Sequence, residues 1–389
     1  MLFRTASALA VMTAFTAAPA FAQSGMSDMP GMEMPKNQIA SSPWQWHVHG
    51  RLSLIADSQS GPRGGDKTLF AGMIMAMANR DFGNNRLDLQ AMLSPDPFMG
   101  KAGYPLLLQS GETADGATHL VDRQHPHDMI MGLSAKLTHR FGDGSTVFGS
   151  VGYPGETPFG PTAFMHRASA EDFPTAPISH HWLDSGHITM GVVTGGFSKG
   201  PVTLEVAQFT GREPDQNRFD LDPVRLDSTA VRLWWQVTPD LKAQASWARQ
   251  VSAEQLEPDV TLRKQSLSAE YGHGPLTATL AWARKQAEHG IEKPADAVLA
   301  EAHWAITQKW SALGRFERVY NDELGPEPAW VSKAEIGGMR TFAIDDMTSV
   351  NVGLVRQFNA VPDVLKTAYG KHPDGTVAFV TLKFHRMKM

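Results

Sequence analysis

Three segments of the chain carry histidine, carboxylate and methionine side chains at spacings that could hold a metal ion. They are Asp122-Arg123-Gln124-His125-Pro126-His127-Asp128, Pro161-Thr162-Ala163-Phe164-Met165-His166-Arg167, and Pro177-Ile178-Ser179-His180-His181-Trp182-Leu183-Asp184-Ser185-Gly186-His187. Neutral imidazole is a common ligand of copper, zinc and nickel, whereas thioether sulfur prefers Cu(I). Because one histidine pair cannot fill a coordination sphere, a site needs ligands from more than one segment. The predicted ligands are His125, His127, Asp122, Asp128, Met165, His166, His180, His181 and His187.

The same segments are also compatible with two other roles. Their charged residues suit a buried network that plugs or narrows a pore: Asp122, Arg123, Asp128, Arg167 and Asp184. Ser179 beside His180, or Ser185 near His187, supplies the residue types of a lipid hydrolase. Sequence neighbours seldom hold the geometry of a nucleophile and its base.

Methionine recurs in two further places. Met26, Met29, Met32 and Met34 lie in a stretch rich in Pro, Gly and Ser, where several thioethers could bind one copper or silver ion. Met73, Met75 and Met77 alternate along a predicted strand, and we expect this stripe to pack against lipid rather than to form a ladder of metal ligands. The histidines at 47 and 49 lie on the polar face of the first predicted strand and, with His303, should face the interior of the molecule.

The first residues and the composition limit the class of protein. Residues 1–22 combine Arg4, an apolar run from Ala6 to Ala18, and Ala20-Phe21-Ala22, the pattern of a cleaved signal peptide. Residues 23–43 show no period and are expected to form a flexible periplasmic tail. The chain has no cysteine, which excludes disulfides and thiolate sites, and its formal net charge of −5 with no basic patch argues against nucleic acid as a partner.

From residue 44 onward apolar and polar residues alternate, which predicts β-strands. Leu87, Leu89, Ala91 and Leu93, for example, alternate with Asp88 and other polar residues. About sixteen such segments follow, most near the ~9–11 residues that a tilted strand needs to cross a bilayer. They are 44–56, 68–80, 85–94, 130–141, 145–153, 187–197, 201–211, 226–237, 241–251, 263–272, 276–285, 298–307, 310–319, 330–342, 349–358 and 376–386.

The connections between these segments alternate between tight turns, such as Gly142-Asp143-Gly144, and long loops, such as 95–129 and 154–186. This asymmetry is typical of outer-membrane barrels, in which the short turns face the periplasm. A soluble β-sandwich is the alternative, but such folds rarely segregate loop lengths so strictly. We therefore predict an antiparallel up-and-down barrel over residues 44–389, with aromatic residues near strand ends as interface girdles: Trp44, Trp46, Tyr153, Phe209, Trp234, Trp235, Trp310, Trp330 and Phe384.

The loop motifs Asp122 to Asp128 and Pro161 to Arg167, with His180-His181-Trp182, resemble those of a family of uncharacterised proteobacterial outer-membrane β-barrel proteins. This resemblance implies a location in the outer membrane of a Gram-negative cell. Residues 26–34 are separately similar to the Met-rich tails of outer-membrane proteins from copper-resistance systems, which implies copper as the ion.

The expected function is therefore a barrel that binds or transports a metal ion, copper first, as part of metal tolerance. Its partners would be outer-membrane lipid, the ion, and a periplasmic metal-handling protein. A porin-like channel for a small polar solute, with loops that fold into the lumen, is the main alternative because about sixteen strands leave room for an aqueous lumen. A lipid hydrolase in the outer membrane is a third hypothesis.

Overall fold

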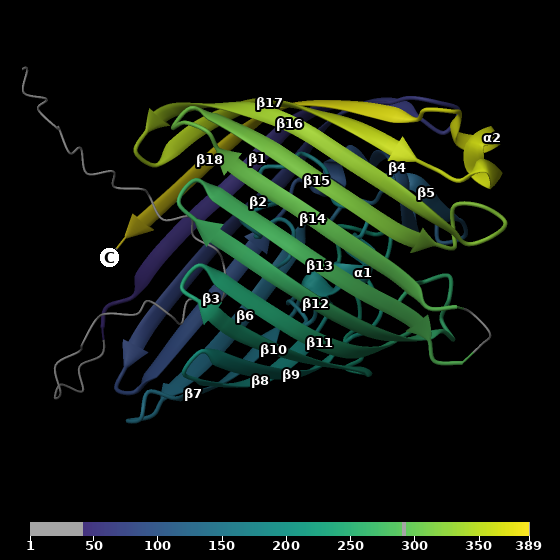
Figure 1. Ribbon diagram of the computed structural model, residues 1–389. Helices are drawn as coiled ribbons and strands as arrows, with labels where there is room; N and C mark the ends of the chain where they lie inside the picture. Colours follow the sequence, from purple (N-terminus) through teal and green to yellow (C-terminus); the bar gives the residue numbers. More distant parts are fainter. Residues whose placement is uncertain (1–41, 290–292, 389) are drawn as a thin grey trace, which may run out of the picture.

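The computed structural model describes residues 42–289 and 293–388, which form one closed β-barrel (Figure 1). Within this part of the chain sixteen antiparallel strands make the wall, and β1 (Gln45–Gln59) pairs with β18 (Asp374–Lys388) to close it. The other wall strands are β2 (Gly65–Phe82), β3 (Asn85–Leu93), β6 (Ile130–Arg140), β7 (Thr146–Gly152), β8 (Val192–Lys199), β9 (Val202–Phe209), β10 (Ser228–Thr238), β11 (Leu241–Val251), β12 (Thr261–His273), β13 (Leu276–Ala287), β14 (Ala295–Ala305), β15 (Trp310–Asn321), β16 (Ala329–Asp345) and β17 (Thr348–Ala360).

The predicted barrel is confirmed, and each of its predicted strands overlaps one strand of the wall. The largest difference lies at the predicted strand 187–197, because β8 begins only at Val192. Ile188 and Met190, which fall within the predicted strand, are 4% and 1% exposed. They are buried because this stretch still belongs to the long loop that precedes β8. The predicted signal peptide and tail lie outside the described residues.

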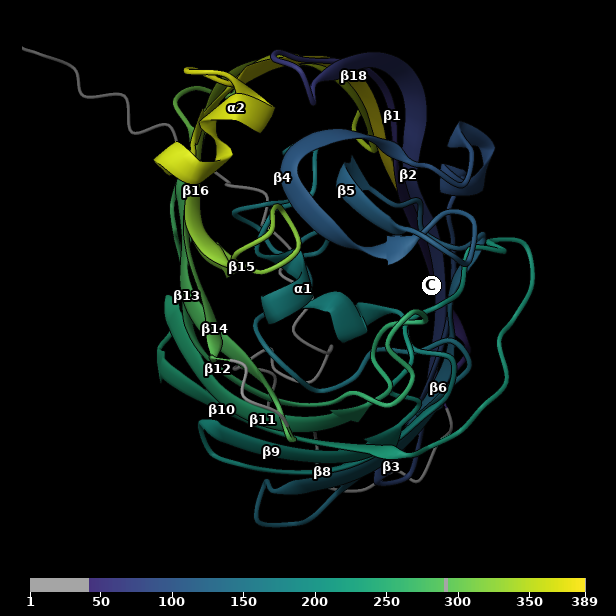
Figure 2. The ribbon, with the colours of Figure 1, turned by 90° about the vertical axis from the view of Figure 1, so that its right-hand side faces the viewer.

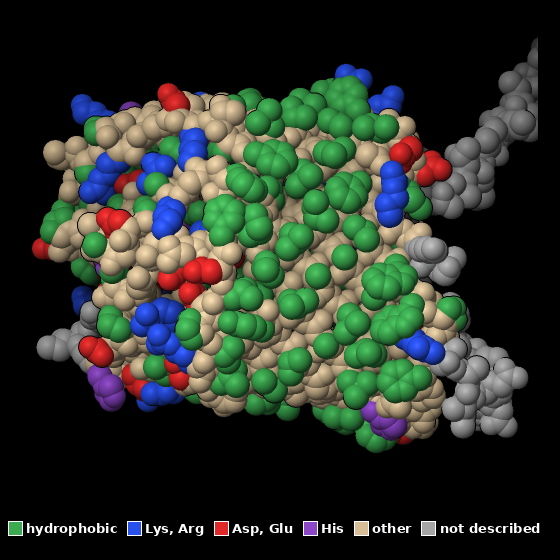
Figure 3. All heavy atoms as spheres, turned by 180° about the vertical axis from the view of Figure 1, so that it is seen from behind, with side chains coloured by type: hydrophobic (Ala, Val, Ile, Leu, Met, Phe, Trp, Pro, Cys, Tyr) green, Lys and Arg blue, Asp and Glu red, His purple; other side chains and the backbone are tan. Residues whose placement is uncertain are grey.

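Alternation along the strands separates the lipid-like exterior from the interior. On β16, Ile336 is 65% exposed while the adjacent Glu335 is 1% exposed. The exterior carries a broad apolar belt, and charged side chains gather near the long-loop end (Figure 3). Such a belt suits the hydrocarbon layer of a membrane. Trp46 and Trp310 face outward as predicted, but Phe209 was predicted wrongly, since it is 2% exposed and packs with Phe159 of a long loop.

The methionine stripe of β2 was also predicted wrongly. Met73 and Met75 are 7% and 1% exposed and pack against Met131 and Ile188 in the interior, whereas Phe70 and Ile74 of the same strand face outward. Period-two alternation identifies two faces, but it does not say which face meets lipid when both carry apolar residues. Among the described residues, no helix is long and apolar enough to cross a membrane.

The two ends of the barrel differ. The short turns and the end of β18 lie on the left in Figure 1, and the long loops lie on the right with α2 (Lys366–Tyr369) and the preceding η3 (Asp363–Leu365). β1 begins at the short-turn end, where Trp46 pairs with Lys388 of β18. The first wall strand therefore begins, and the last wall strand ends, at the short-turn end of the barrel.

Two of the long connections fold into the barrel (Figure 2). The connection between β3 and β6 contains η1 (Asp96–Met99) and a hairpin of β4 (Tyr104–Thr113) and β5 (His119–Gln124), which form a separate two-stranded sheet. The connection 153–191 carries α1 (His180–Leu183) and η2 (Ser185–His187). We call the β4–β5 hairpin and residues 153–191 the plug. The hairpin was not predicted because every residue of β4 is buried, so its two faces do not alternate.

Buried polar contacts fasten the plug to the wall. The Arg167 side chain lies 2.5 Å from the Glu301 carboxylate of β14 and 3.3 Å from that of Asp184. Ser179 donates its hydroxyl to Glu317 of β15 at 2.6 Å. Apolar plug residues, Trp182 among them, pack against small side chains of β13 and β14. The predicted network of Arg167 and Asp184 is thus confirmed.

Candidate metal centre

Five histidines of the plug and its flanking segment come together inside the barrel. The centroid distances are 5.0 Å for His180–His187, 5.3 Å for His180–His181, 5.2 Å for His127–His187 and 5.6 Å for His125–His181. Every one of these side chains is buried. We call His125, His127, His180, His181 and His187 the histidine centre.

Local structure explains how each ring reaches the centre. His125 and His127 follow β5 on an extended segment around Pro126, and α1 holds His180 and His181 on consecutive positions. The start of α1 is anchored because Ser179 donates both its backbone N–H and its hydroxyl to Glu317. η2 then returns the chain so that His187 lies beside His180.

Oxygen atoms lie beside the Nδ1 atoms of four of the rings, and for His125 the oxygen is the carbonyl of Pro126 at 3.2 Å. Nδ1 of His180 lies 2.6 Å from Oδ1 of Asp184, and Nδ1 of His127 lies 2.8 Å from Oδ2 of Asp96. Nδ1 of His187 lies 2.8 Å from the carbonyl oxygen of Asp184. Metal-binding histidines almost always use one ring nitrogen in this way, because the contact fixes the ring and its tautomer and leaves the other nitrogen for the ion.

The opposite nitrogens are buried without partners. In the described part of the chain, no hydrogen bond reaches the Nε2 atoms of His125, His127, His181 and His187. Buried polar atoms are almost always hydrogen-bonded, so these four imidazole nitrogens are available to a ligand. Burial also holds the pKa of His125, His181 and His187 well below the usual value. These rings are therefore neutral, which is the form that binds a metal ion.

Three of the rings bring nitrogens close enough to be candidate ligands of one ion. Ring nitrogens of His125, His180 and His181 lie within 4.8 Å of one another. A tetrahedral Zn²⁺ site with Zn–N bonds of about 2.0–2.1 Å separates its ligand nitrogens by somewhat less than this. The His187 ring lies 5.0 Å from that of His180 and 5.2 Å from that of His127, so two further imidazoles adjoin these three.

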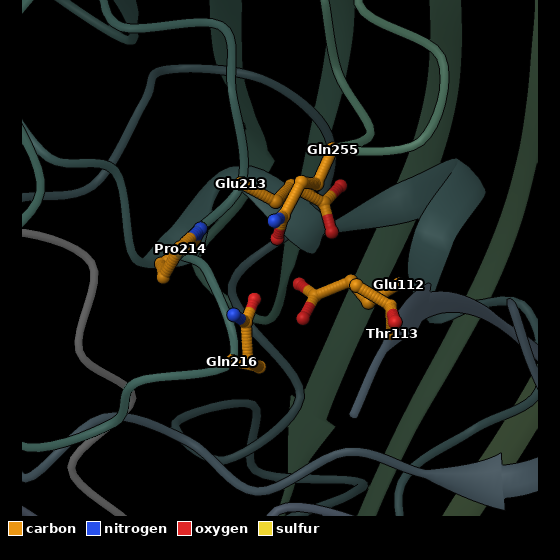
Figure 4. A pocket seen from close by; sticks show the side chains of 6 residues that line it. All are labelled: Glu112, Thr113, Glu213, Pro214, Gln216 and Gln255. Carbon is orange, nitrogen blue, oxygen red and sulfur yellow. The ribbon is translucent and has the colours of Figure 1, made fainter. Parts of the chain in front are cut away.

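An acidic pocket adjoins the centre toward the long-loop end. The side chains of Glu112 and Glu213 reach into the same small space, which Gln216 and Gln255 also line (Figure 4). Glu112 lies 3.6 Å from Nδ1 of His125, and Glu213 lies 3.7 Å from Nδ1 of His181. Burial, with Glu112 beside it, raises the pKa of Glu213 well above the usual value. The pocket is thus a second group of oxygen ligands next to the imidazoles.

The backbone of the hairpin is shaped to make these contacts. Glu112 has a φ of 60°, an uncommon value for a residue with a side chain, and its carboxylate pairs with Arg218. The neighbouring Gly111 has a φ of 113°, and a Cβ there would lie 2.6 Å from Cε1 of His181. The absence of a side chain at Gly111 therefore leaves room for the His181 ring.

The comparisons agree with this architecture. The barrel superposes on OmpF of Salmonella typhi in complex with daunomycin with a TM-score of 0.56 and 10% identity, over 87% of this chain and 97% of that one. It superposes on the channel DcaP of Acinetobacter baumannii (TM-score 0.53, 12% identity, 91% and 100% coverage) and on an anion-selective porin of Comamonas acidovorans (0.52, 11%, 89% and 100%). The fold is that of the outer-membrane porins. No protein-family model matches the chain, and a search of curated protein sequences found no match either.

Within this porin fold, five of the predicted ligands meet and four do not. Asp122 accepts hydrogen bonds from the Leu108 N–H at 2.7 Å and the Tyr369 hydroxyl at 3.0 Å, so it braces the hairpin instead. Asp128 lies 3.8 Å from Arg218, and burial raises its pKa to about 8. Neither carboxylate belongs to the histidine centre, because Asp122 bonds to Leu108 and Tyr369 and Asp128 faces Arg218.

Met165 and His166 also lie apart from the centre. Met165 packs beside the methionines of β2, and burial together with the nearby His49 lowers the pKa of His166 to about 3. Only Phe164 of this motif touches the centre, stacked on His127 with 6.1 Å between ring centroids. Met26, Met29, Met32 and Met34 lie outside the described residues.

Sequence reasoning missed Asp96, Glu112 and Glu213. Asp96 lies in η1 and reaches His127 across 31 positions of sequence, and the two glutamates come from different long loops. No local motif marks them. The signal that could have suggested them is indirect: buried histidines need oxygen partners for Nδ1, and the long loops were the nearest source.

Proposed function

We propose that the protein is an outer-membrane barrel that binds a transition-metal ion, copper first, at the histidine centre inside its lumen. The observation that carries this proposal is the arrangement of the rings, whose Nδ1 atoms contact oxygen while four Nε2 atoms are buried without partners among the described residues. Imidazole ligands suit Cu(II), Zn(II) and Ni(II), and among divalent ions Cu(II) binds most tightly to a given set of nitrogen ligands.

The proposed location in the outer membrane rests on the apolar belt of the exterior and on the two unequal ends of the barrel. The apolar belt would lie in the hydrocarbon layer, the short turns would face the periplasm, and the long loops would face outward. The pocket of Glu112 and Glu213 then lies on the outer side of the histidine centre and adds carboxyl oxygens beside its rings. Handling of metal ions for metal tolerance, with a periplasmic partner, is part of this proposal.

The test is metal binding by the purified mature protein in detergent. Titration with Cu(II) should show tight binding at the centre, and replacement of His180 and His187 by alanine should weaken it at least 100-fold. His273, an exposed histidine near the short turns, provides the matched control, and H273A should bind as the wild type does. Equal affinities in all three proteins would contradict the proposal.

A porin-like channel for a small polar solute is the second candidate, favoured by the names of the structural neighbours, which include an anion-selective porin. It predicts ion conductance in planar bilayers that neither copper nor a chelator changes. The hydrolase hypothesis gains no support within the described residues, because the hydroxyl of Ser179 is bonded to Glu317 and that of Ser185 accepts from Lys264.

The Met-rich tail stays a separate prediction. Copper affinity of the mature chain should fall when Met26, Met29, Met32 and Met34 are replaced by leucine, if the tail captures copper in the periplasm. An unchanged affinity would remove the tail from the proposed function and leave the histidine centre as its basis.

A further inference from the structure

A second group of potential ligands lies in the interior, separate from the histidine centre and different in chemistry. Met75, Met92 and Met131 are at most 4% exposed and pack in one cluster, with Met77 and Met165 at its edge. Leucine would fill such a space with a more defined shape, whereas methionine adds a polarisable sulfur. Several thioether sulfurs are therefore concentrated in one interior cluster.

The strand register extends this cluster into a row of side chains. His385 of β18 is opposite His49 of β1, His49 is opposite Met75 of β2, and Met75 is opposite Met92 of β3. Residues directly opposite each other share one face of the sheet, with Cβ atoms about 4.5–5.5 Å apart. Four neighbouring strands therefore present two imidazoles and two thioethers side by side to the lumen.

A second pair lies one step nearer the short turns. His47 is opposite Met77, and its ring lies 5.2 Å from that of His49 between centroids. Nε2 of His47 and Nδ1 of His49 are buried without a hydrogen-bond partner in the described residues. As at the histidine centre, unpartnered imidazole nitrogens lie beside other potential ligands.

The plug supplies the facing side of this row. Phe164 touches the histidine centre, and Met165 packs on the methionine cluster. The next residue, Arg167, is fixed to Glu301 of the wall. The motif Phe164 to Arg167 thus places consecutive side chains at the histidine centre and at the methionine cluster.

We propose that His49, Met75, Met92 and Met131, with Met165 of the plug, form a second site that binds a soft monovalent ion, Cu(I) or Ag(I). Thioether and neutral imidazole ligands without a carboxylate are the set that favours such ions over Zn²⁺ or Ca²⁺. The ion would bind as Cu(I) or Ag(I), with no change of oxidation state. The site uses none of the five rings of the histidine centre, so either site could exist without the other.

Ag(I) is the probe that tests this site, because it binds thioethers and undergoes no redox change under the assay conditions. The full mature chain is used with the four tail methionines replaced by leucine, so that the tail contributes no sulfur. The M75L/M92L/M131L variant conserves side-chain volume. It is compared with M339L, a buried interior methionine of β16 that lies in a different cluster.

We expect the parent and M339L to bind one Ag(I) equivalent with sulfur neighbours in X-ray absorption spectra. M75L/M92L/M131L should lose that equivalent and the Ag–S signal, while its Cu(II) binding at the histidine centre stays unchanged. H49Q should weaken Ag(I) binding at least tenfold, which gives a second test if the triple variant fails to fold. Conversely, H180A/H187A should lose Cu(II) binding and keep Ag(I).

Undiminished Ag(I) binding in both M75L/M92L/M131L and H49Q would overturn the proposal and leave the row as interior packing. Loss of Cu(II) binding alone in H180A/H187A would leave the second site intact. The parent chain could also bind Ag(I) through these methionines and fail to bind Cu(II). That result would contradict only the proposed histidine centre.

Discussion

Asp184 and His180 form a buried pair, with 2.6 Å between Oδ1 and Nδ1, and the same carboxylate also holds the plug in shape. Its Oδ2 accepts the backbone N–H of Phe164 at 2.9 Å and lies 3.3 Å from the Arg167 guanidinium. One side chain thus orients a candidate ligand and fixes the motif that leads to the second site.

Replacement of Asp184 by asparagine should weaken Cu(II) binding by about 10- to 100-fold, the usual cost of losing a carboxylate behind a metal-binding histidine. The amide keeps the shape but removes the charge that orients His180. Isothermal titration with Cu(II) measures the effect. D143N, at an exposed turn, is the control and should bind normally. An affinity of D184N equal to that of D143N would show that this pair serves folding alone.

Gly111 and Gly116 allow a test of the space around His181. Both have positive φ, so alanine at either position should cost about 1–2 kcal/mol of backbone strain. At Gly111, however, the new Cβ would lie 2.6 Å from the His181 ring, whereas at Gly116 the nearest atoms are glutamine side-chain atoms at 3.4 Å. G111A should therefore lose Cu(II) affinity while G116A keeps it. Similar affinities for the two variants would argue against a role of His181.

Arg167 should keep the plug in place. Alanine at this position would leave the carboxylates of Glu301 and Asp184 short of a partner, and loss of one member of a buried ion pair costs about 3–5 kcal/mol. We expect the plug of R167A to open and the conductance in planar bilayers to rise severalfold above that of the wild type. R386A, at an exposed site near the short turns, should conduct like the wild type. Unchanged conductance of R167A would mean that other contacts hold the plug.

Glu323, in the loop between β15 and β16, should make stability depend on pH. Burial, with Glu254 nearby, raises its pKa to about 8 from 4.5. Between these values the folded protein holds a proton that the unfolded chain has released, so stability falls as pH rises. E323Q should reduce this slope by up to ~1.4 kcal/mol per pH unit, measured by urea unfolding in lipid vesicles at pH 5 to 8.

The control for this prediction is Glu327→Gln, in the same loop but exposed. Its slope should match that of the wild type. If E323Q and E327Q have the same slope, the proton held at neutral pH belongs to another group.

The wall of the barrel could be predicted from local sequence because each strand shows its own alternation, and the turns mark where it ends. The plug could be anticipated only as long loops rich in charge. Its hairpin escaped notice because β4 is buried on both faces, and the methionines of β2 were assigned to lipid because an apolar stripe fits either face of a strand.

The sequence alone determined the closed barrel, the unequal ends and the residue types from which a metal site could be built, because periodicity and turn chemistry act over a few residues. Only the tertiary structure decided which of them meet. His127 finds Asp96, His180 finds Asp184, and Asp122 turns away to Tyr369. The path of a long loop depends on its contacts with distant strands, such as Arg167 with Glu301, 134 positions away, and no local pattern encodes those contacts.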